Sequence, residues 1–80
     1  MNKQRREELN DVVFHLDDAI DRLYEIIDDE QDAYDNLSEG LQNTKTGWGM
    51  MEAIDQMQGF CGEITKIKDK ISDMACNKKK

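Results

Sequence analysis

The sequence predicts an all-α protein that folds as an antiparallel helical hairpin and assembles into a four-helix bundle or a larger oligomer. Its 80 residues contain no proline and only 6% aromatic residues, a composition typical of long helices. In both halves of the chain, apolar residues recur at alternating intervals of three and four, which is the heptad pattern of packed helices. Residues 36–44 interrupt that pattern, and we expect the chain to bend there.

The first heptad pattern predicts a helix over about residues 3–35, a stretch without glycine or proline. A second apolar row at the g positions accompanies the core-facing a and d positions and widens the stripe. Three apolar positions in seven are more than a two-stranded coiled coil needs, so this helix should contact more than one neighbouring helix. The a and d positions hold Leu9, Val13, Leu16, Ile20, Leu23, Ile27 and Tyr34, interrupted by Glu30, and the g positions hold Val12, Ala19, Ile26 and Ala33.

The second heptad pattern predicts a helix over about residues 45–76. Its a and d positions hold Met50, Ile54, Met57, Cys61, Ile64, Ile71 and Ala75, with Lys68 as the one departure, and its g positions hold Ala53, Phe60, Ile67 and Met74. The matching faces favour antiparallel packing, and an isolated hairpin would leave apolar surface exposed and bury too little. We therefore expect a homo-oligomer with a core of Leu9, Val13, Leu16, Ile20, Leu23, Ile27, Ile54, Met57, Phe60, Ile64, Ile67 and Ile71.

The connection, residues 36–44, collects residues that satisfy free helix ends. Thr44 or Thr46 is a candidate N-cap for the second helix, and Ser38 is expected to cap a short turn. Leu37 and Leu41, four residues apart, are expected to fold over the open end of the hairpin core.

Trp48 lies between two glycines, Gly47 and Gly49, at the start of the second helix. The missing side chains would let another segment of backbone approach closely. One interpretation makes Trp48 an aromatic lid on the end of the core, and the other makes it an exposed anchor in a partner interface.

The segment 30–42, EQDAYDNLSEGLQ, resembles a connection found in small acidic proteins of bacterial and phage or mobile-element genomes. Members of that group typically read D-N-L-P-E-S-L-Q here, and Ser38 and Gly40 replace the usual proline and serine. The resemblance implies a helical hairpin and a mobile-element context, and it brings no assigned activity.

Acidic residues dominate the first half of the chain. The net charge is −7, with 12 acids and 4 bases in residues 1–35 and 6 acids and 7 bases in residues 36–80. This balance disfavours nucleic acid and anionic membranes as partners and favours basic proteins, while the lysines of residues 77–80 are expected to form a solvated tail. Opposite the apolar stripe we expect an acidic ridge, which is either a solvated outer face or a docking strip for a basic protein: Asp18, Asp21, Glu25, Asp28, Asp32 and Asp35.

No residue pattern indicates an enzyme, a cofactor or a metal site. His15 is the only histidine, and Cys61 and Cys76 lie about 22 Å apart on one helix, too far for a disulfide and too few for zinc. No apolar run is long enough for a signal peptide or a transmembrane helix, so we expect a cytoplasmic protein.

The expected function is therefore that of a non-enzymatic oligomeric binding protein, an accessory or inhibitor that a phage or mobile element directs at a host protein. The ridge and Trp48 are the candidate partner-binding residues. One alternative is an oligomer that sequesters a small, nucleotide-like ligand at the connection, around Lys45 and Trp48. Another alternative is a purely structural oligomerisation module.

Overall fold

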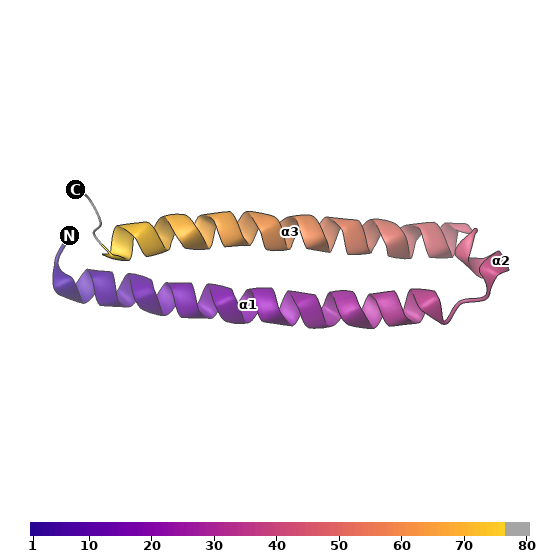
Figure 1. The fold of residues 1–80 in the computed structure, drawn as a ribbon, viewed down its shortest axis with the longest axis horizontal. Coiled ribbons are helices and arrows are strands. Elements are labelled where there is room, and N and C mark those ends of the chain that lie inside the picture. The colour runs from indigo at the N-terminus through magenta and orange to yellow at the C-terminus, as the bar shows by residue number, and fades with distance from the viewer. Residues whose placement is uncertain (77–80) are drawn as a thin grey trace.

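The computed structural model describes residues 1–76 and shows an antiparallel helical hairpin (Figure 1). Helix α1 spans Lys3–Asp35, the short helix α2 spans Glu39–Gln42, and helix α3 spans Lys45–Cys76. The two long helices pack along their whole length, and the hairpin measures 58 × 18 × 14 Å. The predicted helical hairpin is confirmed, whereas the lysine tail predicted for residues 77–80 lies outside the described residues.

Local interactions define where α1 begins and ends. The side-chain oxygen of Asn2 accepts a hydrogen bond from the backbone N–H of Arg5 at 2.9 Å, which is an N-cap. After Asp35, the backbone N–H of Asn36 still donates to the carbonyl of Asp32 at 3.0 Å, and the chain then leaves the helix. Between these ends no glycine or proline interrupts the 33 residues.

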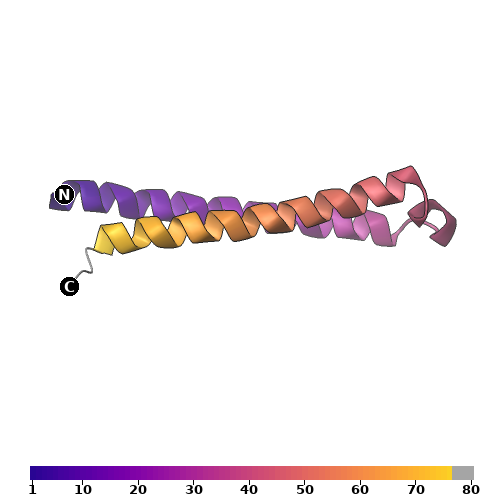
Figure 2. The ribbon, with the colours of Figure 1, turned by 90° about the horizontal axis from the view of Figure 1, so that it is seen from above.

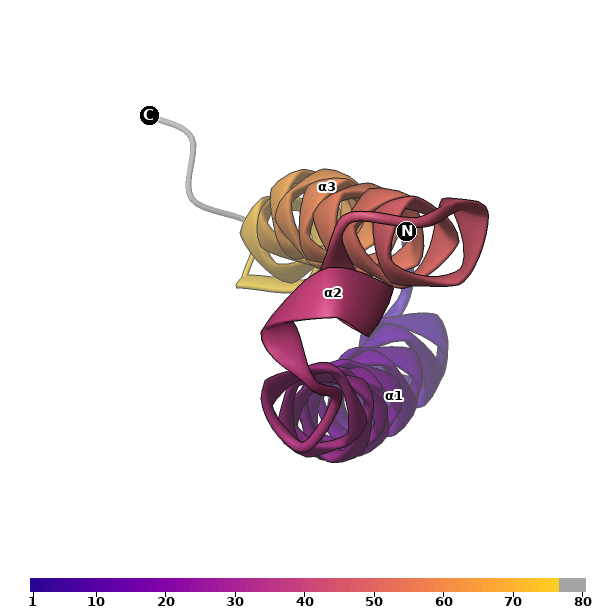
Figure 3. The ribbon, with the colours of Figure 1, turned by 90° about the vertical axis from the view of Figure 1, so that its right-hand side faces the viewer.

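The core is the a/d seam between the two long helices. Its centre is a cluster of Ile27, Ile54 and Cys61, with Leu23 and Met57 packed against it. Viewed from the connection end, α1 and α3 form two layers of a single helix each, joined by α2 (Figure 3). Because each helix has one neighbour in the described chain, most a/d side chains are only half-buried, and the buried apolar ones are Ile20, Ile27, Ile54, Cys61 and Ala75.

Gln42 holds the connection together. Its side-chain amide donates to the carbonyls of Tyr34 at 3.1 Å and Leu37 at 3.4 Å, two acceptors at the end of α1. Its backbone lies against Gly47, where a Cβ would stand 2.6 Å from the Gln42 carbonyl carbon. The same residue therefore satisfies the end of α1 and contacts the first turn of α3. Ser38 caps α2 as expected, since its hydroxyl accepts from the N–H of Leu41 at 3.3 Å.

Three expectations for this end of the hairpin are wrong. Leu41 does not cover the core, because α2 turns it outward and leaves it 51% exposed, while Leu37 is half-buried. Trp48 is 60% exposed and is not a lid on the single hairpin. Only Gly47 allows a close backbone approach, since a Cβ at Gly49 would meet nothing within 4 Å.

The hydroxyl of Thr44, one of the two candidate N-caps, donates to the Leu41 carbonyl at 2.6 Å. The Thr44 carbonyl accepts from the N–H of Trp48 at 2.9 Å, so its backbone does open α3.

Candidate functional site

The most distinctive surface of the hairpin is a double row of exposed apolar residues along one long side. We call it the apolar flank. It consists of eight of the ten g positions of the two long helices, the other two being Arg5 at the start of α1 and Thr46 at the start of α3, and its larger side chains are between 41% and 58% exposed. Its eight members are Val12, Ala19, Ile26 and Ala33 from α1 and Ala53, Phe60, Ile67 and Met74 from α3.

The two rows lie on the same side of the hairpin because α1 and α3 are antiparallel. A half-turn about an axis perpendicular to the plane of the two helices converts the direction of α1 into that of α3. This rotation leaves the g positions on the side from which they started. The groove at the free ends of the helices agrees with this, since Val12 and Met74 line it together. This open groove has a volume of about 440 Å³ and is completed by Met1, Arg5, Glu8 and Leu9.

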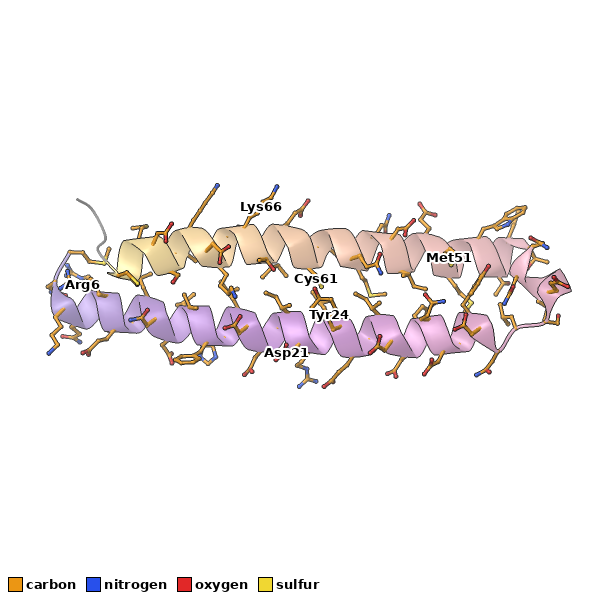
Figure 4. The ribbon with its side chains drawn as sticks, viewed as in Figure 1. Arg6, Asp21, Tyr24, Met51, Cys61 and Lys66 are labelled. Atoms are coloured by element: carbon orange, nitrogen blue, oxygen red, sulfur yellow. The ribbon has the colours of Figure 1, made fainter. Side chains whose placement is uncertain are left out.

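The opposite side, which carries the e positions, is mainly polar, and we call it the polar flank. Figure 4 shows two of its members, Tyr24 and Met51, near the line between the helices, whereas Asp21 and Lys66 point outward. The two sides of the same hairpin therefore differ sharply in chemistry. The polar flank consists of Asn10, Asp17, Tyr24 and Gln31 from α1 and Met51, Gln58, Thr65 and Ser72 from α3.

Lys68 interrupts the apolar seam and is accommodated by Asp17. The Lys68 Nζ donates to Asp17 Oδ1 at 2.8 Å, between an a position of α3 and an e position of α1. This hydrogen bond is the main cause that raises the pKa of Lys68 above its ordinary value. The sequence marked Lys68 as a departure from the heptad but did not reveal its partner, because the partner depends on the register of the hairpin.

The acidic ridge occupies the b and f positions of α1, and all six of its carboxylates are exposed. Within residues 1–76, the carboxylates that lie close to basic side chains are others, namely Asp17, which bonds Lys68, and Asp11, whose Oδ2 lies 3.4 Å from His15 Nε2. Asp35 accepts a hydrogen bond from the side chain of Gln31 at 3.1 Å. The ridge and the apolar flank lie on different sides of α1, since b and f are separated from g by the c position.

The remaining candidate residues do not assemble into a chemical site. His15 is exposed, Cys61 is a buried free thiol in the seam, and Cys76 is an exposed free thiol near the end of α3. Among residues 1–76, no three histidine, cysteine, aspartate or glutamate side chains are grouped to hold a metal ion. None of the helices in that part of the chain is long and apolar enough to cross a membrane.

Comparison with known proteins adds no relative. The chain matches no family model, no curated protein and no solved structure. The candidate site is therefore defined by surface chemistry alone, namely the apolar flank, the acidic ridge and the exposed Trp48.

Proposed function

We propose that the protein is a non-enzymatic, self-associating helical hairpin whose assembled surface binds a protein partner. The observation that carries this proposal is the apolar flank, whose eight apolar residues have no covering element in residues 1–76. The occupant we propose for it is a second copy of this chain.

The size of the flank supports a second copy. The broad face of the hairpin measures 58 × 18 Å, or about 1,000 Å², and a stable protein interface buries about 800 Å² on each partner. The view perpendicular to that of Figure 1 shows the two long helices crossing at a shallow angle along their length (Figure 2). A second hairpin of the same length and twist can therefore follow the face from end to end, as in a four-helix bundle.

The chemistry of the flank also favours burial. Soluble monomers rarely expose large contiguous apolar patches, and five large side chains of the flank are at least 41% exposed. Burying the flank would also cover the half-exposed d positions beside it, among them Leu9, Leu16 and Leu23. The hydrophobic effect would thus act on the flank and on the edge of the seam together.

Sedimentation equilibrium at micromolar concentration tests self-association with a matched pair of variants. Phe60 on the apolar flank is 49% exposed and Tyr24 on the polar flank is 52% exposed. We expect the wild type and Tyr24→Glu to show at least twice the monomer mass of 9.3 kDa. Phe60→Glu should approach the monomer mass, because a buried carboxylate without a partner is costly. A helical wild-type monomer, or equal loss of mass in both variants, would contradict the proposal.

We propose that the acidic ridge is the surface that meets the partner, and that the partner is a basic host protein, with the chain acting as an accessory or inhibitor of a phage or mobile element. The ridge supports this because its carboxylates are exposed, regularly spaced and aligned along one helix, an arrangement that arginine side chains can bind in a bidentate manner. Affinity capture from a host lysate followed by mass spectrometry tests it. The control is a variant in which Asp18, Asp21, Glu25, Asp28 and Asp32 are changed to Asn or Gln.

A basic protein captured by the wild type and lost with the neutralised variant would support docking through the ridge. Equal capture by both would reject the ridge and point to Trp48 and the connection. Self-association without any captured partner would favour the purely structural module.

A further inference from the structure

We propose that the second copy docks with its connection at the opposite end of the assembly, so that α1 packs on α1 and α3 packs on α3. This inference rests on the proposed self-association through the apolar flank and specifies its geometry. We consider two hairpins that pack flank against flank, have parallel long axes and are related by a two-fold axis. Only two arrangements meet these conditions. Either the connections lie at the same end and each helix faces the other helix of its partner, or they lie at opposite ends.

The register of the hairpin fixes which flank residues lie at the same level. Asp17 is bonded to Lys68, and Val12 shares a groove with Met74. Residues of α1 and α3 therefore lie side by side when their numbers add up to about 85. The flank thus has four levels, starting from the connection: Ala33 with Ala53, Ile26 with Phe60, Ala19 with Ile67, and Val12 with Met74.

The sizes of these side chains disfavour connections at the same end. That arrangement brings each level against the same level of the second copy. Four alanines would then meet at the level of Ala33 and Ala53, and four large side chains at the next level, that of Ile26 and Phe60. Packed helices cannot be close at one level and wide apart 10 Å further on without leaving a cavity or crowding, and both are unfavourable.

Placing the connections at opposite ends matches an alanine with a larger side chain in three of the four pairs. Along α1 the flank alternates in size, so reversing one copy sets each alanine against a branched side chain. Along α3, the smallest flank side chain, Ala53, meets the longest one, Met74. The pairs across the interface are Ala33 with Val12, Ile26 with Ala19, Ala53 with Met74, and Phe60 with Ile67.

A further geometric condition is also met. In this arrangement the two-fold axis runs across the flank from α1 to α3. It must therefore pass the midpoint of the α1 row and the midpoint of the α3 row at the same height along the hairpin. The midpoint of the α1 row lies between Ala19 and Ile26, and that of the α3 row between Phe60 and Ile67. These midpoints, 22.5 and 63.5, add up to 86, which matches the register set by Asp17 and Lys68. One axis therefore serves both helices, as the pairing of the four levels already implies.

Charge does not prevent α1 from packing on α1. The c positions next to the flank carry a mixed set, namely Glu8, His15, Arg22 and Asp29. The ridge lies beyond them on the outer edge of α1, so the two ridges would lie side by side and not face each other across the interface, and salt screens their repulsion. If the connections lay at the same end, Arg22 would come near Glu63 of the second copy. This contact does not decide between the arrangements, because an exposed ion pair contributes little compared with packing.

Distance measurement by pulsed electron spin resonance distinguishes the arrangements. The spin label is attached through Gly40→Cys in α2, where a Cβ meets nothing within 4 Å, in a Cys76→Ser background that leaves only the buried Cys61. If the connections lie at opposite ends, the distance between the two Gly40 labels should be comparable to the 58 Å length of the hairpin. Connections at the same end predict less than about 30 Å, since packed helices lie 8 to 10 Å apart.

A second label, through Glu25→Cys near the middle level, is the control for association. Both arrangements place two such labels within about 40 Å of each other. A dimeric mass with a single long Gly40 distance supports the inference, and any population of short Gly40 distances overturns it while leaving self-association intact. A monomer mass together with no dipolar signal from either label would refute self-association itself.

Discussion

Replacing Gly47 by alanine should destabilise the hairpin, although the same change elsewhere in α3 should stabilise it. Glycine inside a helix is about 0.5 to 1 kcal/mol less favourable than alanine. At Gly59, where a Cβ meets nothing within 4 Å, Gly59→Ala should therefore raise the free energy of unfolding by about that amount. Gly59→Ala is the matched control for Gly47→Ala.

The structure gives the magnitude for Gly47→Ala. A Cβ there would stand 2.6 Å from the carbonyl carbon and 2.7 Å from the Cα of Gln42, where ordinary contact begins at 3.4 Å. The Gln42 carbonyl oxygen would stand closer still, so the Gln42 backbone must retreat by more than about 0.8 Å, which typically costs about 1 to 3 kcal/mol as overpacking. The movement also strains the hydrogen bonds from Gln42 to Tyr34 and Leu37, each worth about 0.5 to 1.5 kcal/mol.

After the helix-propensity gain, we expect Gly47→Ala to lower the free energy of unfolding by about 1 to 3 kcal/mol. For a chain of this size, each kcal/mol lowers the melting temperature by about 4 to 8 °C. Urea and thermal unfolding followed by circular dichroism, at one fixed protein concentration, measure both variants. If Gly47→Ala stabilised the protein as much as Gly59→Ala, the packing of Gln42 on α3 described above would be incorrect.

Three further changes test the seam, the interhelical ion pair and the ridge. Ile20→Asp or Ile64→Asp should abolish the cooperative helical unfolding transition, because burying an unpaired carboxylate costs several kcal/mol; wild-type melting of both would mean that the heptad assignment is wrong. The bond that raises the pKa of Lys68 contributes fully below the ordinary lysine pKa and is lost as pH rises through the raised value. The urea midpoint of the wild type should therefore fall relative to that of Lys68→Met as pH rises above the ordinary lysine pKa of about 10.4, and parallel profiles would refute this contribution. If the acidic ridge docks a basic partner, wild-type affinity should fall as salt rises from about 50 to 300 mM and the neutralised variant should bind weakly throughout; a flat salt response in both proteins would assign the ridge to solvation.

Heptad periodicity was sufficient to predict the hairpin, because the identity of the buried face depends only on spacing along each helix. Ile20, Ile27, Ile54 and Cys61 were predicted in the seam and are buried. The same periodicity predicted the two g rows, which are exposed on the single chain. Their proposed place in an oligomer core is a separate question that the mass and distance measurements address.

The connection could not be predicted at the same level of detail. The direction of Leu41 depends on the single turn of α2, and the exposure of Trp48 depends on where α3 starts relative to the end of α1. The contacts that join this end of the hairpin come from Gln42, whose side chain bonds the last turn of α1 and whose backbone contacts α3. A glutamine in a polar linker carries no sequence signal for that role. The Asp17–Lys68 bond was missed for a related reason, since it joins residues 51 positions apart.

The separation of the two surfaces connects self-association with partner binding. In the proposed arrangement, the two copies of α1 lie along one edge of the assembly and the two copies of α3 along the other. The α1 edge then carries both acidic ridges, whereas α3 has five acids against four bases and is nearly neutral. Because the charge is concentrated on one edge, the field there is stronger than that of a single hairpin, and a basic partner would be steered to that edge. A variant that is monomeric but retains the ridge, such as Phe60→Glu, should therefore associate with the partner more slowly than the wild type at low salt. Equal association rates would show that partner binding does not depend on self-association.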